Sequence, residues 1–230
     1  MGGVARADEA WRALDAVIDP ELDQPITELK FVRSLDVVGT DVVVHLRLPT
    51  SFCAPNFSYL MASDAKDALT ALAWTRRVTV ELDDHHDSDL INRGLAADAG
   101  YKGTFRHEAD QDLEELRTTF RRKAHTAAME RVLTRLVQQG RPIESLGTVT
   151  IGDLPADGAT HALLQRRKAI GLSEGEGDLV FVDHAGTPYP EVELPLQLRL
   201  ARSTRISIEG NAHFCRGLLA TRYDLTESAS

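Results

Sequence analysis

The chain has little of what marks a secreted, membrane-bound or nucleic-acid-binding protein. Two cysteines among 230 residues are too few for a disulfide framework. No stretch approaches the roughly 20 consecutive apolar residues of a membrane helix, and Met1 to Trp11 lack the apolar run of a secretory signal. A net charge of −9 argues against the basic footprint of a general nucleic-acid binder. We therefore expect a cytoplasmic protein with reduced thiols that binds neither membranes nor nucleic acids.

Signatures of the common enzyme classes are missing as well. The sequence has no Walker loop, no dinucleotide fingerprint after a strand, no G-x-S-x-G elbow and no H-E-x-x-H helix. Hydrophobic residues nevertheless make up 43% and charged residues 27% of the chain, which is the balance of a folded globular protein. This combination favours a function that is not enzymatic.

The hydrophobic pattern predicts an α+β fold that begins with a two-layer unit. Strands are expected where apolar residues alternate with polar ones, and helices where apolar residues recur every three or four positions. The predicted order is α-β-β-α-β-α, over residues 8–18, 32–38, 42–48, 53–72, 78–82 and 88–95. Such a unit contains two apolar layers that can cover each other, so residues 1–103 are expected to form a domain.

The remaining sequence predicts a long helix and a smaller α+β region. A charged helix over 111–139, closed by Gly140, is expected to link the two parts across residues 104–140. Residues 141–230 are expected to hold a helix over 161–170 and short strands near 149–151 and 179–182. The clearest predicted strand is 191–200, in which leucines alternate strictly with polar residues and Pro195 indicates an edge position. We expect this edge to pair with 206–208 and to dock a partner protein.

The most informative motif places Cys53 at the start of the helix that follows the predicted hairpin. A thiolate is the form of cysteine that binds soft metals, and a helix N-terminus stabilises it. Asp19, Pro20 and Glu21 form a compact acidic turn that could fold back towards this thiol. The two carboxylates would then tune the thiol, bind iron or dock a client. The alternative is that the turn only ends a helix and its carboxylates are solvated.

These residues resemble the small Fe–S cluster assembly domain of SufT-type and PaaD-type maturation proteins. In that family a D-P-E turn precedes a hairpin, and a T-x-x-x-C-P segment opens the next helix. Here the turn is Asp19-Pro20-Glu21, and the second segment runs from Thr50 to Pro55, with Ala54 between Cys53 and the proline. The resemblance covers about residues 8–100 and leaves the C-terminal extension without a counterpart.

The resemblance implies that Cys53 is a ligand to iron or to a transiently held Fe–S cluster. Thr50 and Pro55 would shape the loop around the thiol, and Asp19 and Glu21 would support it. Because one thiolate cannot supply the four ligands typical of a cluster, a homodimer, an exogenous thiol or the client must complete the set. The alternative for Cys53 is a small buried core residue.

Two further groups are candidates for metal ligands. His213 and Cys215 would share a face of an extended segment and could chelate one metal ion, whereas in a helix they point apart and Cys215 packs in the core. The sequence does not specify whether Cys215 approaches Cys53. His85 and His86 alternate in direction on an extended backbone, so we interpret them as a polar linker before a helix cap.

Three functions are compatible with these residues. The first is a non-enzymatic maturation factor that holds or delivers iron or an Fe–S cluster to a client metalloenzyme. By analogy with PaaD-type proteins, the client would be a component of a multicomponent monooxygenase, selected by residues 141–230. The second is a metal-free chaperone or scaffold for an apo-oxygenase. The third is a cysteine-dependent enzyme in which Cys53 is the nucleophile and His45 or His213 the base.

Overall fold

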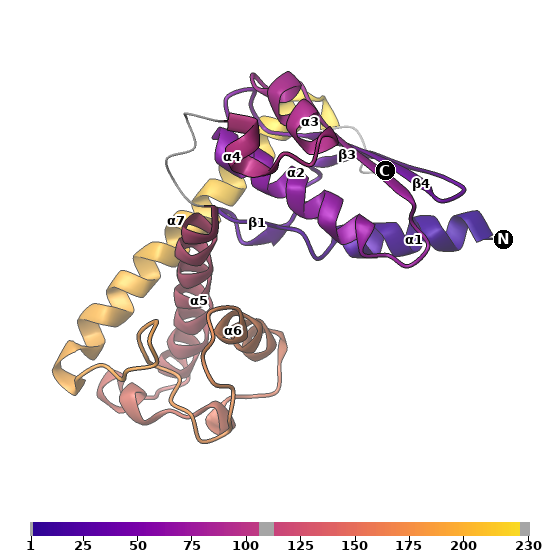
Figure 1. Ribbon diagram of the computed structural model, residues 1–230. Helices are drawn as coiled ribbons and strands as arrows, with labels where there is room; N and C mark the ends of the chain where they lie inside the picture. Colours follow the sequence, from indigo (N-terminus) through magenta and orange to yellow (C-terminus); the bar gives the residue numbers. More distant parts are fainter. Residues whose placement is uncertain (1, 106–112, 226–230) are drawn as a thin grey trace. The chain divides into compact units, whose positions relative to one another are not determined.

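The computed structural model describes residues 2–105 and 113–225, and its contacts divide the chain into two compact units (Figure 1). The first unit comprises Met1–Leu113 together with Asn211–Ser230, and the second comprises Glu114–Gly210. Each unit has its own hydrophobic core. The predicted α+β class is confirmed. None of the helices described combines the length and apolar character needed to cross a membrane.

The first unit is built on a three-stranded sheet that follows the predicted order. Strands β3 (Val32–Val38) and β4 (Asp41–Arg47) form an antiparallel hairpin, and β5 (Arg77–Asp83) lies parallel to β4. Helix α2 (Pro55–Thr70) makes the crossover that a parallel pair requires. Side chains alternate along β4, so one face of that strand is buried. The parallel pairing places the apolar residues of β5 on the same buried face. The buried residues of the two strands are Val42, Val44, Leu46, Val80 and Leu82.

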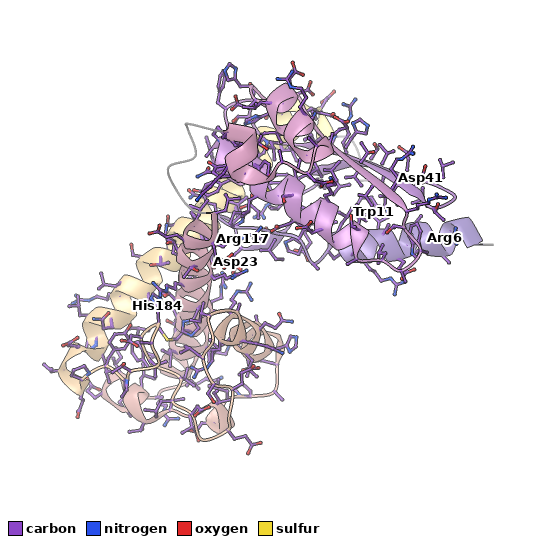
Figure 2. All side chains as sticks on the ribbon, viewed as in Figure 1. Arg6, Trp11, Asp23, Asp41, Arg117 and His184 are labelled. Carbon is purple, nitrogen blue, oxygen red and sulfur yellow. The ribbon has the colours of Figure 1, made fainter. Side chains whose placement is uncertain are left out.

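Helix α1 (Gly2–Leu14) contacts this sheet and α2. Its apolar side chains Ala10 and Leu14 are fully buried. Its polar side chains hold the hairpin: Arg6 donates to the carbonyl of Gly39 at 2.8 Å, next to Asp41 in Figure 2. The guanidinium of Arg6 also lies 5.3 Å from the ring centroid of Trp74. These contacts attach the N-terminal helix to the turn that follows β3 and to the loop between α2 and β5.

Short elements complete the first unit. Strands β1 (Ile18–Asp19) and β2 (Gln24–Pro25) pair around the acidic turn. Helices α3 (Ser88–Ala96) and α4 (Gly100–Phe105) follow β5. At their contact Gly94 lies against Thr104, and a Cβ added at Gly94 would fall 2.0 Å from the Thr104 hydroxyl oxygen. This close approach is possible only with glycine.

The second unit is mainly helical. It contains most of α5 (Leu113–Gln138), the 3-10 turns η2 (Ile143–Thr148) and η3 (Ile151–Asp153), and α6 (Gly158–Ala169). The predicted linking helix is therefore helical over Leu113–Gln138, and residues 106–112 of its range lie outside the described part of the chain. Near the predicted strands 149–151 and 179–182 the structure has isolated bridges, Thr150 with Leu179 and Val182 with Pro188.

The strand predicted over 191–200 is wrong. A 3-10 turn, η4 (Glu191–Glu193), leads into α7 (Leu194–Arg222), which continues through the residues expected to pair with that strand. The strict alternation misled because the alternating residues are mostly leucines, which favour helices, whereas strands favour β-branched side chains. Pro195 is compatible with this assignment because it occupies the first helical turn, where no amide donor is needed. Buried positions recur at helical spacing, at Leu194, Ala201, Ile208, Ala212 and Leu219.

Candidate functional site

Cys53 lies in the loop between β4 and α2, immediately before the N-cap residue Ala54. Its side chain is half-buried and packs against the core of the first unit. Pro55 is the first residue of the helix, where its fixed φ angle suits the geometry. The thiol therefore sits at the positive end of the α2 dipole, as the sequence predicts.

Thr50 supports the thiol directly. Its hydroxyl oxygen accepts a hydrogen bond from the amide of Phe52 at 3.1 Å and lies 3.5 Å from the sulfur of Cys53. A thiolate can only accept, so when Cys53 is ionised the Thr50 hydroxyl donates its proton to Sγ. The loop thus provides one fixed donor for a sulfur anion.

His85 holds the same loop from the other side, a role that the sequence interpretation missed. Its Nδ1 accepts from the amide of Asp87 at 3.1 Å, which leaves the ring proton of the neutral tautomer on Nε2. Nε2 then donates to the carbonyl of Cys53 at 2.8 Å, and the Ser58 hydroxyl lies 3.3 Å away. The imidazole is buried and therefore acts as a strut between the loop after β5 and the loop that carries the thiol.

The acidic turn carries one buried carboxylate. Oδ1 of Asp19 accepts from the amides of Glu21 at 2.9 Å and Leu22 at 2.8 Å, which closes the turn. Burial raises the pKa of Asp19 to about 6, although these two amides act in the opposite direction. Asp19 is therefore part of the first core, and the interpretation of the turn as solvated is wrong for this residue.

Helix α7 brings the second cysteine to this region. Cys215 is half-buried against the same hydrophobic core as Cys53. Burial raises the pKa of the Cys215 thiol to about 11, and Cys53, Asp19 and Glu21 add to this effect in that order. Arg216 is the neighbour that opposes it. The thiol of Cys53 and the carboxylates of Asp19 and Glu21 thus all lie within electrostatic reach of Cys215.

His213 does not join this group. In a helix, residues two positions apart point to different sides, so the pair His213 and Cys215 diverges in α7. His213 is exposed, whereas Cys215 faces the core. Of the two second metal candidates from the sequence, only Cys215 lies on the side of Cys53.

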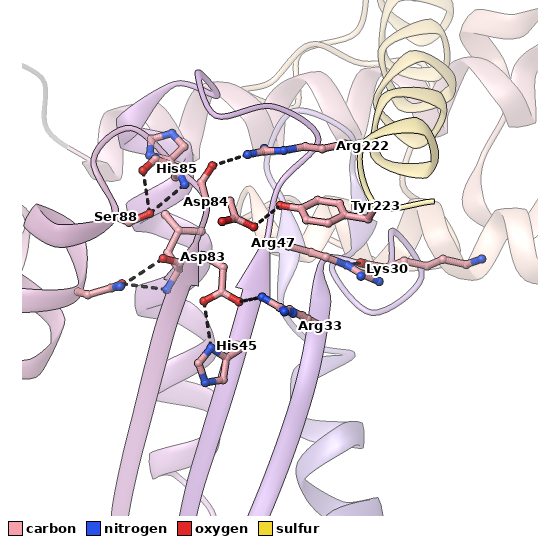
Figure 3. A network of polar contacts seen from close by, with 12 residues as sticks. Lys30, Arg33, His45, Arg47, Asp83, Asp84, His85, Ser88, Arg222 and Tyr223 are labelled. Carbon is pink, nitrogen blue, oxygen red and sulfur yellow. Dashed lines mark hydrogen bonds and ion pairs between the residues drawn. The ribbon is translucent and has the colours of Figure 1, made fainter. Parts of the chain in front are cut away.

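The end of α7 is attached to the strand ends from which both loops emerge (Figure 3). Arg222 donates to the carbonyls of Leu48 and Asp84, the residues that follow β4 and β5. The hydroxyl of Tyr223 donates to the carboxylate of Asp84 at 3.3 Å. The guanidinium of Arg47 stands 5.1 Å from the Tyr223 ring centroid. These contacts fix the C-terminal helix beside the thiol loop.

His45, the expected base of a cysteine-dependent enzyme, is engaged elsewhere in the same network. Its Nδ1 lies 3.0 Å from the carboxylate of Asp83, whose other oxygen binds Arg33 at 2.9 Å (Figure 3). His213 is exposed on α7. Among the described residues neither imidazole contacts the thiol of Cys53, so neither forms a nucleophile–base pair with it.

The thiols and carboxylates near Cys53 are donor types that iron binds. Thiolates are the standard ligands of iron–sulfur clusters, and the partly buried carboxylates beside them would gain a counter-charge from a cation. Across residues 2–105 and 113–225, no group of three or more His, Cys, Asp or Glu side chains is already arranged to hold a metal ion. The arrangement therefore offers an incomplete ligand set, open to donors from another molecule.

Comparison with known proteins bears on the first unit alone. Residues 7–82 match the family model described as iron-sulfur cluster assembly protein, which is well under half of the chain. No match was found among curated proteins or among solved structures. The matched segment includes the acidic turn and the thiol loop, but it ends before His85 and Cys215. The resemblance to iron–sulfur cluster assembly domains is thereby confirmed for residues 7–82.

Proposed function

We propose that this chain is a non-enzymatic maturation factor that holds iron or an Fe–S cluster at Cys53 and delivers it to a client metalloenzyme. The family match supports a role in cluster assembly or delivery. The observation that carries the assignment to Cys53 is its fixed loop at the N-terminus of α2, between the Thr50 hydroxyl and the His85 strut. Such a loop presents sulfur with a donor already in place, which suits a thiolate ligand.

The proposed iron or cluster is cargo, and its hold on the chain is transient. One or two thiolates leave positions open that a client, a second copy of the chain or an exogenous thiol can occupy. Ligand exchange at these positions would transfer the cargo. The chain's own residues orient the sulfur and keep its backbone fixed. We place this exchange in the cytoplasm, where thiols stay reduced.

Exposed apolar residues are the proposed contacts to the client. Phe52, next to the thiol, is 80% exposed and lies against the ring of His86. Val192 in η4 and Leu196 and Leu200 in the first part of α7 recur every fourth residue and are all exposed. We propose that this helical face in residues 141–230 binds the client, in place of the edge strand expected from the sequence. By resemblance to PaaD-type proteins, the client is a multicomponent monooxygenase.

Anaerobic reconstitution with Fe(II) and sulfide tests the metal role. Wild-type protein should take up iron with cluster absorption, and Cys53→Ser should lose both. Ser51→Ala, in the same loop, is the matched control and should bind as the wild type does. Equal iron content in the wild type and Cys53→Ser would reject Cys53 as the ligand.

The exposed apolar face also supports a second candidate, a metal-free chaperone for an apo-oxygenase. The two functions differ in what the client needs. Leu196→Ser with Leu200→Ser should abolish client co-purification under both functions while leaving iron uptake intact. Cys53→Ser should abolish client maturation in cells only if the chain delivers metal. A Cys53→Ser protein that matures its client normally would favour the metal-free function.

A further inference from the structure

We propose that Cys215 of α7 is the second thiolate of the Cys53 site, so that the C-terminal helix completes a two-thiol metal site on the assembly domain. This inference rests on the proposed function and extends it beyond the family match, which ends at residue 82. It gives the extension a chemical role at the cargo site in addition to client binding.

Hydrogen bonds fix α7 on both sides of Cys215. Before it, the amide of Asn211 donates to the carboxylate of Glu21 at 3.1 Å. One residue after it, Arg216 donates to the side chain of Gln24 at 2.6 Å. Further along, Arg222 donates to the carbonyl of Leu48 at 3.0 Å. The first contact attaches the helix to the acidic turn, the second to β2, and the third to the strand end that leads into the Cys53 loop.

Helical spacing then directs Cys215 inward. Ala212 and Leu219 lie three residues before and four residues after it, which places all three on one face. Ala212 is 0% and Leu219 is 1% exposed, and both belong to the core that Cys53 also contacts. Phe214, on another face, is 65% exposed. Cys215 is therefore held on the thiol side of the helix by packing as well as by hydrogen bonds.

The charges around the two thiols favour a cation. Cys53, Asp19 and Glu21 all act electrostatically on Cys215, and Arg216 is the one cation acting on it. The guanidinium of Arg216 is already bound to Gln24. Two thiolates beside two carboxylates repel one another unless a positive ion lies among them, and soft divalent metals prefer sulfur ligands.

Two protein thiolates suit a site that must release its cargo. A closed structural site uses four protein ligands, whereas a site with fewer keeps positions open for exchange. A tetrahedral iron bound by Cys53 and Cys215 has two positions left for donors of the client. The incomplete set of donors in the described residues is consistent with this half-site.

Titration of the reduced full-length chain with Co(II), followed by thiolate-to-metal charge-transfer absorption, tests the inference without client or activity. The absorption per bound Co(II) grows with the number of thiolate ligands, so Cys215→Ser and Cys53→Ser should each show roughly half the wild-type intensity and weaker binding. His213→Ala, two residues away and exposed, should match the wild type. Circular dichroism and the fluorescence of Trp11 and Trp74 verify that each variant is folded.

Alkylation with a bifunctional thiol reagent provides a second measurement that needs no metal. It should join Cys53 to Cys215 within one chain of the wild type and form no such link in either variant. If Cys215→Ser binds Co(II) with the full wild-type spectrum while Cys53→Ser does not, the inference fails and the proposed role of Cys53 stands. If neither variant changes the spectrum, both fail.

Discussion

Burial of the Asp19 carboxylate should make the stability of the first unit depend on pH by a predictable amount. Its pKa is raised from 3.8 to about 6 because burial penalises the charged form. A difference of this size corresponds to about 3 kcal/mol between the two protonation states. Since the folded pKa lies above the unfolded one, this destabilisation is absent below the unfolded pKa, grows as the pH rises, and is complete above the folded pKa.

Asp19→Asn isolates this effect. The amide oxygen can still accept from the amides of Glu21 and Leu22, so the turn keeps its two hydrogen bonds, but the side chain carries no charge. At about pH 8 the variant should be more stable than the wild type by about 2–3 kcal/mol, and below about pH 4 the two should converge. Asp36→Asn, at an exposed position of β3, is the matched control and should change stability by less than about 0.5 kcal/mol.

Urea unfolding followed by tryptophan fluorescence measures the stability of the first unit. The chain has two tryptophans, Trp11 and Trp74, and both lie in the first unit. The signal therefore reports on the unit that contains Asp19, even if the second unit unfolds separately. An Asp19→Asn protein that is no more stable at about pH 8, or whose advantage does not depend on pH, would refute the argument that burial penalises the charged form of this carboxylate.

Three further predictions address the rest of the chain. His125 is fully buried, and burial lowers its pKa to about 4. Because protonation is then favoured in the unfolded state, α5 should lose about 3 kcal/mol of protection against hydrogen exchange as the pH falls from 6.5 to 4. His125→Leu should remove this pH dependence. His85→Phe removes the strut to the Cys53 carbonyl and should weaken Co(II) binding by roughly tenfold or more in the same titration. Leu219→Ala leaves a cavity in the first core and should cost about 2–5 kcal/mol in fluorescence-detected unfolding.

The opposite pH dependences of the two units distinguish them in one experiment. His125 packs near His184, with ring centroids 6.2 Å apart, and among the described residues neither ring nitrogen of His125 has a hydrogen-bond partner. Protonation of His125 therefore destabilises the second unit as the pH falls. Protonation of Asp19 relieves the first unit over part of the same range. Tryptophan fluorescence and hydrogen exchange in α5 should shift in opposite directions.

The sheet of the first unit could be predicted because one alternating pattern marks both the strands and the face that each strand buries. Val42, Val44 and Leu46 alternate with polar residues and occupy one face, and Val80 and Leu82 repeat that pattern in the neighbouring strand. The period of two therefore corresponds to real burial. The position of Cys53 followed from the same logic, because a hairpin and a proline at the helix start enclose it.

The role of His85 could not be predicted from spacing. Its neighbours in sequence, Asp87 and Ser88, indicate a helix start, and its ring does accept from the amide of Asp87. The contact that holds the Cys53 loop is with the carbonyl of Cys53, 32 residues earlier. A carbonyl is present at every position, so the sequence contains no signal for which one a histidine will bind. The parallel pairing of β4 and β5, which brings the two loops together, was needed to find it.

The misassigned strand and the unpredicted position of Cys215 have one physical cause. In the alternating run after residue 190, half of the apolar residues are exposed on α7, and the buried positions Leu194, Ala201 and Ile208 emerge only at helical spacing. Once the segment is a helix, that spacing continues through Ala212 and Leu219 into the first core and carries Cys215 to the thiol side. A strand ending near residue 200 would have left Cys215 in a separate element with no fixed direction. The assignment of this one helix therefore decides whether one cysteine or two pack against the core of the first unit.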